Sequence, residues 1–256
     1  PIKIIKEITE TVSNPSFRAL FIATLFGLLA SGISASLNQY INGFFWGFTS
    51  DQIGLITFCI FGSAVMALFI AQIAGKALGK KKAAIIIGIL AFSLAPAPVF
   101  ARLLGLLPPN GTDELFYIVL TISVIDVALI ISYQMLTAAM VADIVEQSEL
   151  KTGRRSEGVF FAGISFIRKL AQGIGILSAS AILAFASITP GQKTTEASAE
   201  SVASLGLGYA VILLTVWTLM IISLSFYRIS RAEHEQNLKD LADREQQGSK
   251  PDTIFM

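Results

Sequence analysis

The chain has 256 residues, a formal net charge of +1, and 54% hydrophobic residues, with a mean hydropathy of +0.69. Soluble domains seldom combine so apolar a composition with only 14% charged residues, so a soluble globular protein is not expected. The near-zero net charge gives no electrostatic reason to expect nucleic acid as a partner. The single cysteine, Cys59, cannot form an internal disulfide and is expected to act as a small core hydrophobe.

The apolar residues gather into six long runs, each long enough to cross a membrane as a helix. About 20 residues at a rise of ~1.5 Å span a hydrocarbon core of ~30 Å. A mixed-charge lead-in over residues 1–16 precedes them, and a polar tail over 230–256 follows. The sequence therefore predicts an all-α membrane protein whose six-helix bundle covers residues 17–229, with spans at about 17–46, 52–74, 83–104, 113–143, 157–188 and 202–227.

Three local signals punctuate this pattern. Pro96 and Pro98 fall inside the third run and predict a kink or break, because proline removes a helical hydrogen bond. Residues 75–82 form a tight basic turn, and the mixed charges of residues 1–7 do not resemble a signal peptide. The chain begins without Met, which is compatible with a fragment of a longer protein.

The distribution of Lys and Arg predicts the orientation of the bundle. When the loops are assigned to alternating sides, 15 of the 19 Lys and Arg residues fall on one side and only Arg102 and Lys193 on the other. The positive-inside rule then places both termini in the cytoplasm, together with a run of charges at residues 143–157. Arg168 and Lys169 fall within the fifth span and are not counted.

Ionisable residues inside a span are costly, so each is by default a functional hypothesis. Lys169 lies about 18 Å along a helix from Glu157, near the middle of the membrane, and Asp126 lies about 25 Å from Asp143. Arg168 could extend toward the headgroups or pair with an acid. A buried ammonium at Lys169 needs an acceptor or water, which favours a wet cavity.

Polar residues share one helical face on three of the predicted spans, and three such faces can line a common cavity. The alternative is that the small and hydroxyl residues only pack helix against helix. The faces comprise Thr24, Gly27, Ser31, Ser34, Asn38 and Asn42 on the first span, Asp126, Tyr133, Gln134 and Thr137 on the fourth, and Gly158, Ala162, Ser165, Lys169 and Gln172 on the fifth.

Aromatic residues crowd the outer end of the first span, where Tyr40, Phe44, Phe45, Trp46 and Phe48 occur together. They form either an interfacial aromatic belt or a platform for stacking on a sugar ring. His234 is expected to be exposed in the tail. The sequence shows no metal-ligand spacing, phosphate-binding loop or nucleophile–base pattern, so neither an enzyme nor a metal centre is expected.

The charged run resembles the signature of the glycoside–pentoside–hexuronide:cation symporters, the major-facilitator branch that includes melibiose permease. The residues that carry the resemblance keep the family's spacing and are Asp143, Glu146, Glu149, Lys151, Arg155, Glu157 and Lys169. Residues 37–48 resemble the family's seventh helix, and residues 75–82 resemble the cytoplasmic loop that major-facilitator proteins repeat in each half. The resemblance implies the C-terminal six-helix half of a twelve-helix transporter.

The resemblance also implies function and roles. It implies secondary active transport of a sugar or glycoside, coupled to Na⁺ or H⁺ by alternating access in a bacterial plasma membrane, with no cofactor. The coupling-cation site is expected mostly in an N-terminal half, which is a necessary partner along with the lipid bilayer. The implied substrate-binding residues are Lys169, Gln134, Ser165, Asn38, Tyr40 and Asp126, and the implied gate residues are Asp143, Glu146, Glu149, Arg155 and Glu157.

Three alternatives stay open at the level of sequence. The gate charges could merely fix topology and satisfy helix ends. A major-facilitator transporter of another solute, such as an organic anion or a lipid-like molecule, would use Lys169 and Arg168 as anion ligands. A non-transporting six-helix membrane protein, such as a sensor or an assembly factor, belongs to a different class.

Overall fold

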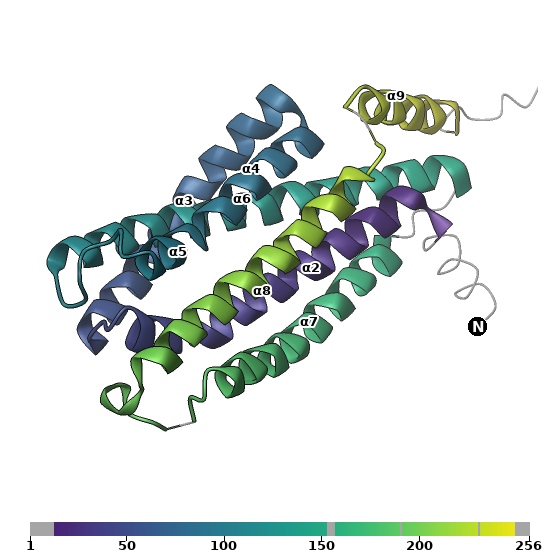
Figure 1. Ribbon diagram of the computed structural model, residues 1–256. Coiled ribbons are helices and arrows are strands. Elements are labelled where there is room, and N and C mark those ends of the chain that lie inside the picture. Colours follow the sequence, from purple (N-terminus) through teal and green to yellow (C-terminus); the bar gives the residue numbers. More distant parts are fainter. Residues whose placement is uncertain (1–12, 153–156, 190, 230, 249–256) are drawn as a thin grey trace, which may run out of the picture.

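The computed structural model of the protein describes residues 13–152, 157–189, 191–229 and 231–248, and these ranges are almost entirely helical (Figure 1). Six of the described helical segments are long and apolar enough to cross a membrane, which confirms the predicted all-α six-helix bundle. The membrane-crossing helices are α2 (Pro15–Tyr40), α3 (Ser50–Leu78), α4 (Lys80–Leu94) with α5 (Ala97–Leu103), α6 (Asp113–Thr152), α7 (Glu157–Phe185) and α8 (Ala199–Ser225).

Local sequence explains where these helices begin. Asn14 caps α2 by accepting hydrogen bonds from the backbone N–H groups of Ser16 and Phe17, with Pro15 in the first turn. Thr49 and Gln52 form a capping box at the start of α3. Gly79 separates α3 from α4 with a φ of +79°, a conformation that favours glycine.

The third span is broken where the sequence predicted a break. Helix α4 ends at Leu94 and α5 begins at Ala97, directly after Pro96. The first span is also irregular, because α2 continues into a π-helical turn over Ile41–Phe45. Such irregular backbone is tolerated in a membrane where it is buried in protein or lines a cavity.

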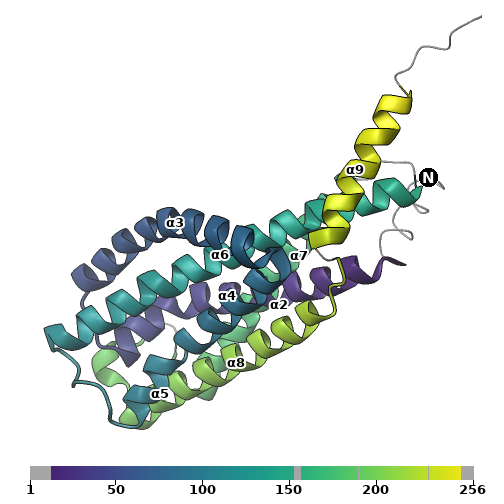
Figure 2. The same cartoon turned by 90° about the horizontal axis from the view of Figure 1, so that it is seen from above.

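The six spans form two interlocked groups of three, as Figures 1 and 2 show. Helix α2 packs mainly against α7 and α8, whereas α6 packs mainly against α3 and α4. The first helix of each sequential triplet therefore lies against the second and third helices of the other triplet. This exchange is the arrangement expected when the six spans form a repeat of three helices plus three helices.

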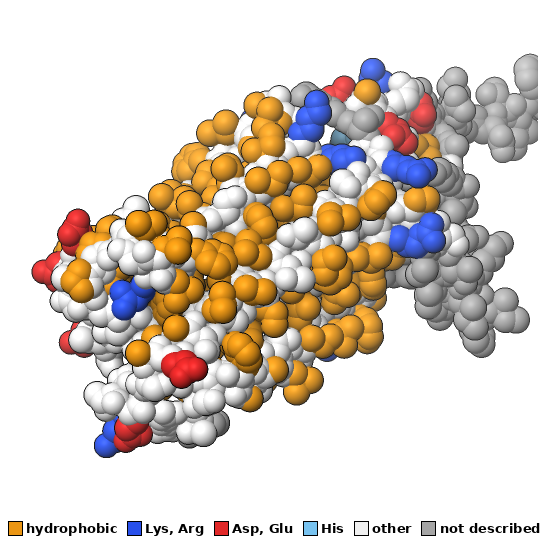
Figure 3. Space-filling model, in the orientation of Figure 1, with side chains coloured by type: hydrophobic (Ala, Val, Ile, Leu, Met, Phe, Trp, Pro, Cys, Tyr) orange, Lys and Arg blue, Asp and Glu red, His pale blue; other side chains and the backbone are white. Residues whose placement is uncertain are grey.

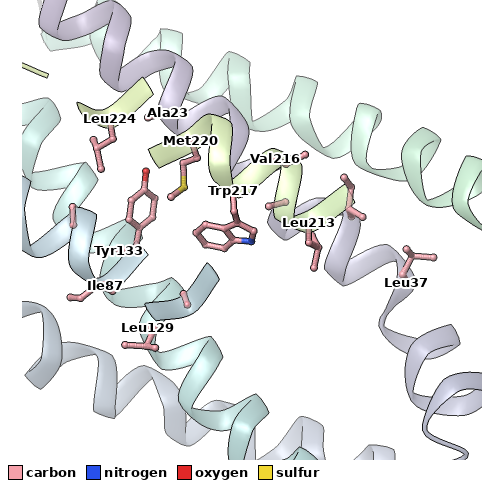
Figure 4. Packing of buried hydrophobic residues seen from close by; sticks show 14 of the residues in the cluster. Ala23, Leu37, Ile87, Leu129, Tyr133, Leu213, Val216, Trp217, Met220 and Leu224 are labelled. Atoms are coloured by element: carbon pink, nitrogen blue, oxygen red, sulfur yellow. The ribbon is translucent and has the colours of Figure 1, made fainter. Parts of the chain in front are cut away.

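The centre of the bundle is packed around two side chains, Tyr133 of α6 and Met220 of α8 (Figure 4). Gly27 of α2 and Gly88 of α4 give them room, since a Cβ on either glycine would lie 3.2–3.3 Å from Met220. Trp217 packs edge-on against Tyr133, with ring centroids 6.2 Å apart. The four helices that meet here hold the polar faces of α2 and α6 toward each other.

Helix α6 is longer than the expected span of 113–143, because it continues without a break to Thr152. Its 40 residues extend about 60 Å, twice the thickness of a hydrocarbon core. The beginning of the charged run is thus helical rather than a loop. The tail forms helix α9 (Arg231–Gly248), which lies beyond the end of the bundle beside the end of α6 (Figure 2).

The surface of the bundle is apolar between two polar ends (Figure 3). Side chains such as Phe58, Phe61 and Leu177 are more than 70% exposed. Lys and Arg gather at the end beside α9, and the acidic residues in this view lie at both ends of the belt. A continuous apolar belt of this kind is the surface that a lipid bilayer covers.

Candidate functional site

A cavity of about 340 Å³ lies within the membrane-spanning bundle, and we call it the polar cavity after the polar side chains that interrupt its mostly apolar walls. Its walls come from α2, the π-helical turn, α3, the α4–α5 break, α6 and α8. The break contributes directly, because Ala95, Pro98 and Val99 line the cavity. The polar side chains around it are Ser31, Ser34, Asn38, Asn42, Ser123, Asp126, Gln134 and Tyr209.

These polar groups are only partly satisfied by one another. The Asn42 amide nitrogen donates to Asn38 Oδ1 at 2.9 Å, and Tyr209 Oη donates to Ser34 Oγ at 3.4 Å. Asp126 Oδ1 is buried and has no hydrogen-bond partner among the described residues. Buried polar atoms normally have partners, so this cavity is suited to a polar ligand.

Gln134 links this cavity to a smaller one of about 70 Å³, because it lines both. The smaller cavity lies against Tyr133 and Trp217 and also contacts Ile164 and Arg168 of α7. The predicted convergence of polar faces therefore holds for α2 and α6, which share Ser31 and Gln134 at the junction.

The polar face of α7 is placed differently. Ser165, Lys169 and Gln172 are exposed, and neither Lys169 nor Ser165 lines a cavity described here. Lys169 is the thirteenth of the 29 residues of α7 and so lies near the middle of the span. An ammonium exposed to lipid at that depth would be costly.

The aromatic cluster is mostly core. Phe45, Trp46 and Phe48 are buried, and Phe48 packs edge-on against Phe116 with ring centroids 5.4 Å apart. The belt interpretation is wrong for these three rings, because they pack inside the bundle. Trp46 is the aromatic residue of this group that lines the 340 Å³ cavity. Tyr40 does not line it and instead stacks on Phe44.

A second group of functional candidates lies at the end of the bundle near α9. Lys80 Nζ lies 2.5 Å from Asp143 Oδ1, and His234 Nδ1 lies 3.4 Å from the same oxygen and 3.0 Å from Glu146 Oε2. We call these four residues the gate cluster. It connects the start of α4, the C-terminal part of α6 and helix α9. The expectation that His234 is simply exposed is wrong, since its side chain is 19% exposed.

A hydrogen-bond chain of two side-chain amides and one carboxylate runs beside the gate cluster. Asn14 Nδ2 donates to Gln147 Oε1 at 3.2 Å, and Gln147 Nε2 donates to Glu233 Oε1 at 3.0 Å.

Tyr227 Oη donates to the Met140 carbonyl oxygen at 3.4 Å. Burial, reinforced by the charges of Asp143, Glu233 and Glu146, raises the pKa of Tyr227 above its usual range.

The remaining expected gate residues take no described part in this cluster. Glu149 is half-buried on α6 and forms no ion pair with another described residue. Arg155 lies outside the described residues, and only the backbone of Glu157, at the start of α7, is described.

Asp143, Glu146 and His234 could each offer one metal-ligand atom, with all three atoms within 4.8 Å of one another. Lys80 already neutralises the Asp143 oxygen that faces the histidine. The Lys80–Asp143 ion pair therefore accounts for part of the group, whereas Glu146 Oε2 and His234 Nδ1 lie 3.0 Å apart without a hydrogen bond among the described residues. Periodicity could not have found it, because His234 is 91 positions from Asp143 in the sequence.

A cavity with polar groups inside a six-helix bundle of two interlocked triplets is the architecture of a polytopic membrane protein, and the two triplets match a repeat of three helices plus three helices. A family model described as MFS/sugar transport protein matches residues 1–231, and the chain belongs to this family. The expected membership of the major-facilitator superfamily is thereby confirmed, whereas its glycoside–pentoside–hexuronide subdivision stays a prediction.

Two curated relatives are similar over most of the chain. An uncharacterized symporter of Bacillus subtilis is 25% identical over 230 residues, which cover 90% of this chain and 47% of the relative. An uncharacterized symporter of Synechocystis is 26% identical over 249 residues, which cover 95% of this chain and 43% of the relative. The chain thus spans a little under half the length of these relatives. No solved structure matches it significantly.

Proposed function

We propose that the chain forms one half of a symporter that moves a sugar or glycoside together with Na⁺ or H⁺ by alternating access. The polar cavity is the observation that carries this proposal. Its volume of about 340 Å³ lies within the range of small-molecule sites, and its amides, hydroxyls and single carboxylate suit the hydroxyl groups of a neutral sugar. Asn38, Gln134 and Asp126 are the proposed ligands.

The other half of the transporter is proposed to cover the exposed faces of α3 and α7. Within an apolar 18-residue stretch of each span, only 17% and 22% of the residues of these two helices are buried, against 33–39% in the other four. The exposed stripe around Lys169 supports this arrangement, since a second protein surface can supply acceptors that lipid cannot. In that arrangement Lys169 and Ser165 would complete the solute site at the contact between halves.

The gate cluster supports an inner gate at the other end of the same helix. Asp143 and Glu146 lie in the C-terminal part of α6. The central part of the same helix lines the cavity through Asp126 and Gln134. In the proposed cycle the ion pairs of this cluster form in one state and separate in the other. The bias of Lys and Arg toward this end favours a cytoplasmic location for both termini, in a bacterial plasma membrane.

Uptake by proteoliposomes that contain the full-length protein tests this function. Labelled glycosides should accumulate when a Na⁺ or proton gradient is imposed, and Lys169→Ala should abolish that accumulation. Lys193→Ala removes an equivalent charge from the opposite end of the bundle and should have no effect. Accumulation of an organic anion instead of a glycoside would replace the sugar proposal with the anion alternative, whereas wild-type accumulation by Lys169→Ala would refute its role.

A further inference from the structure

A second large cavity of the described structure lies apart from the proposed solute-binding cavity. It has a volume of about 770 Å³ and opens between the α3–α4 turn, α6, the segment after α8, and α9. It lies at the end of the bundle where Lys and Arg gather beside α9 (Figure 3). Neither Asp126 nor Gln134 lines it, so it is separate from the proposed solute-binding cavity, although Lys80, Asp143 and His234 of the gate cluster lie on its wall.

Cations dominate the rim of this cavity. Two carboxylates, Asp143 and Glu235, face five cationic side chains, which leaves an excess of positive charge. The cations are Lys76, Lys80, Lys81, Lys82 and Arg228.

The lysines of the α3–α4 turn differ in their contacts. Lys80 is paired with Asp143, and Lys81 Nζ donates to the carbonyl oxygens of Ser225 and Tyr227, at the end of α8. The side chains of Lys82 and Arg228 have no hydrogen-bond or ion-pair partner within the described ranges. Two cations are therefore available to an anion at this rim.

The start of α4 adds to the local positive potential. Lys80–Lys82 occupy its first turn, which contains no acidic residue and has no side-chain cap. A helix N-terminus carries partial positive charge and exposed N–H groups, so three lysines there are unfavourable without an anion. Asp143 is the anion that pairs with Lys80, whereas no anion among the described residues pairs with Lys82.

The wall below this rim is apolar. Its residues from α3, α6 and the tail include Ala71, Leu78, Leu136, Ala139, Ile229 and Leu238. On α3, Phe69 and Ile73 are exposed on the apolar belt near the lining residues Ala71 and Gln72. The cavity thus combines a cationic rim with an apolar wall at the edge of the membrane belt.

We propose that this cavity binds an anionic phospholipid of the surrounding leaflet, with its phosphate at Lys82 and Arg228 and an acyl chain along the wall formed by Leu136 and Ala139. Basic pockets between helices at a membrane boundary are suited to anionic headgroups. A soluble phosphate would use only the rim, whereas a lipid uses both the charge and the apolar wall. The site is independent of which solute the protein carries.

Native mass spectrometry of the full-length protein, titrated with phosphatidylglycerol or phosphatidylethanolamine of identical acyl chains, tests the proposal. Phosphatidylglycerol should bind roughly tenfold more tightly, and the double variant Lys82→Gln/Arg228→Gln should lose that preference. The matched variant Lys193→Gln/Lys239→Gln removes two exposed charges elsewhere and should retain it. Equal binding of the two lipids by the wild type, or an unchanged preference in the Lys82/Arg228 variant, would overturn the proposal.

A second variant separates the apolar wall from the charges. Ala139→Phe fills the cavity and leaves every cation in place, so it should weaken phosphatidylglycerol binding while the monodisperse protein keeps its unfolding temperature. Glycerol phosphate, which lacks acyl chains, should not displace the lipid at equal concentration. Displacement by glycerol phosphate, or undiminished lipid binding by a folded Ala139→Phe protein, would show a rim for soluble anions and contradict the lipid assignment.

Discussion

Lys80 Nζ lies 2.5 Å from Asp143 Oδ1, and this ion pair joins the start of α4 to the C-terminal part of α6. The Asp143 side chain is 6% exposed and the Lys80 side chain 34%. Water therefore reaches the ammonium but hardly reaches the carboxylate. A carboxylate buried to this extent depends on its partners, since desolvating an unpaired charge is costly.

Asp143→Asn should accordingly destabilise the protein, because it leaves Lys80 beside a neutral amide. We expect a loss of about 1–3 kcal/mol in unfolding free energy, measured by denaturant unfolding in detergent. Asp240→Asn, at an exposed site on α9, serves as the control and should change little. Equal stability of the two variants would show that the pair contributes nothing measurable.

Tyr227 gives the junction of α8 and α9 a dependence on pH. Its folded-state pKa is raised, so the folded protein keeps the phenolic proton at a pH where the unfolded chain has lost it. The stabilisation is complete below the usual pKa of about 10 and is lost as the pH rises above it. Thermal unfolding measured between pH 8 and 11 should show a steeper decline for the wild type than for Tyr227→Phe. Parallel curves would contradict this prediction.

Removal of the His234 imidazole should loosen α9. His234→Ala removes the contacts with Glu146 and Asp143 and leaves the Gln147–Glu233 hydrogen bond as a weaker attachment. Hydrogen exchange measured by mass spectrometry should accelerate across residues 231–248 and stay unchanged in α8. Lys239→Ala, at an exposed position on the same helix, provides the control, and equal exchange in both variants would show that His234 does not hold the helix.

Gly175 of α7 approaches α2 so closely that a Cβ would lie 2.9 Å from the carbonyl carbon of Gly32. Gly175→Leu should force the two helices apart and cost about 1–3 kcal/mol of stability. Gly173→Leu is the matched control, because no atom lies within 4 Å of a Cβ built there. The unfolding temperature of Gly175→Leu should be lower than that of Gly173→Leu. Equal unfolding temperatures of the two variants would contradict the prediction.

Gln134 of α6 lines the cavity and is one of the proposed solute ligands. Gln134→Ala should raise the KM for the transported glycoside by roughly tenfold, which corresponds to the loss of one to two hydrogen bonds to a buried polar ligand. Ser180→Ala alters an exposed hydroxyl of α7 and should leave KM unchanged. A tenfold decrease in the maximal rate with an unaltered KM would contradict a role for Gln134 in solute binding.

The sequence predicted the spans and the Pro96 break because both depend on local residues. Apolar run length sets where a helix can cross the membrane, and proline at position 96 cannot continue the hydrogen-bond ladder. The shared polar faces of α2 and α6 were also predictable, since helical periodicity places Ser31 with Asn38 and Asp126 with Gln134.

The contacts between distant segments were not predictable in this way. Charged residues such as Glu146 and Glu149 are compatible with either a loop or an extended helix, and packing against α9 favours the helix. Periodicity fixes which face of a helix is polar but not which neighbour covers it. The expected cavity wall on α7 therefore became an exposed face around Lys169, and His234 acquired carboxylate partners that no spacing rule could indicate.

The unbroken length of α6 has a mechanical consequence. Asp126 and Asp143 are 17 residues apart on one continuous helix, which is about 25 Å of rigid rod. If a solute tilted this rod by roughly 10° about the cavity, Asp143 would swing sideways by about 4 Å. That displacement is larger than the 2.5 Å that separates it from Lys80. In the proposed transport cycle, a small rotation of α6 at mid-membrane would therefore be enough to separate Lys80 from Asp143.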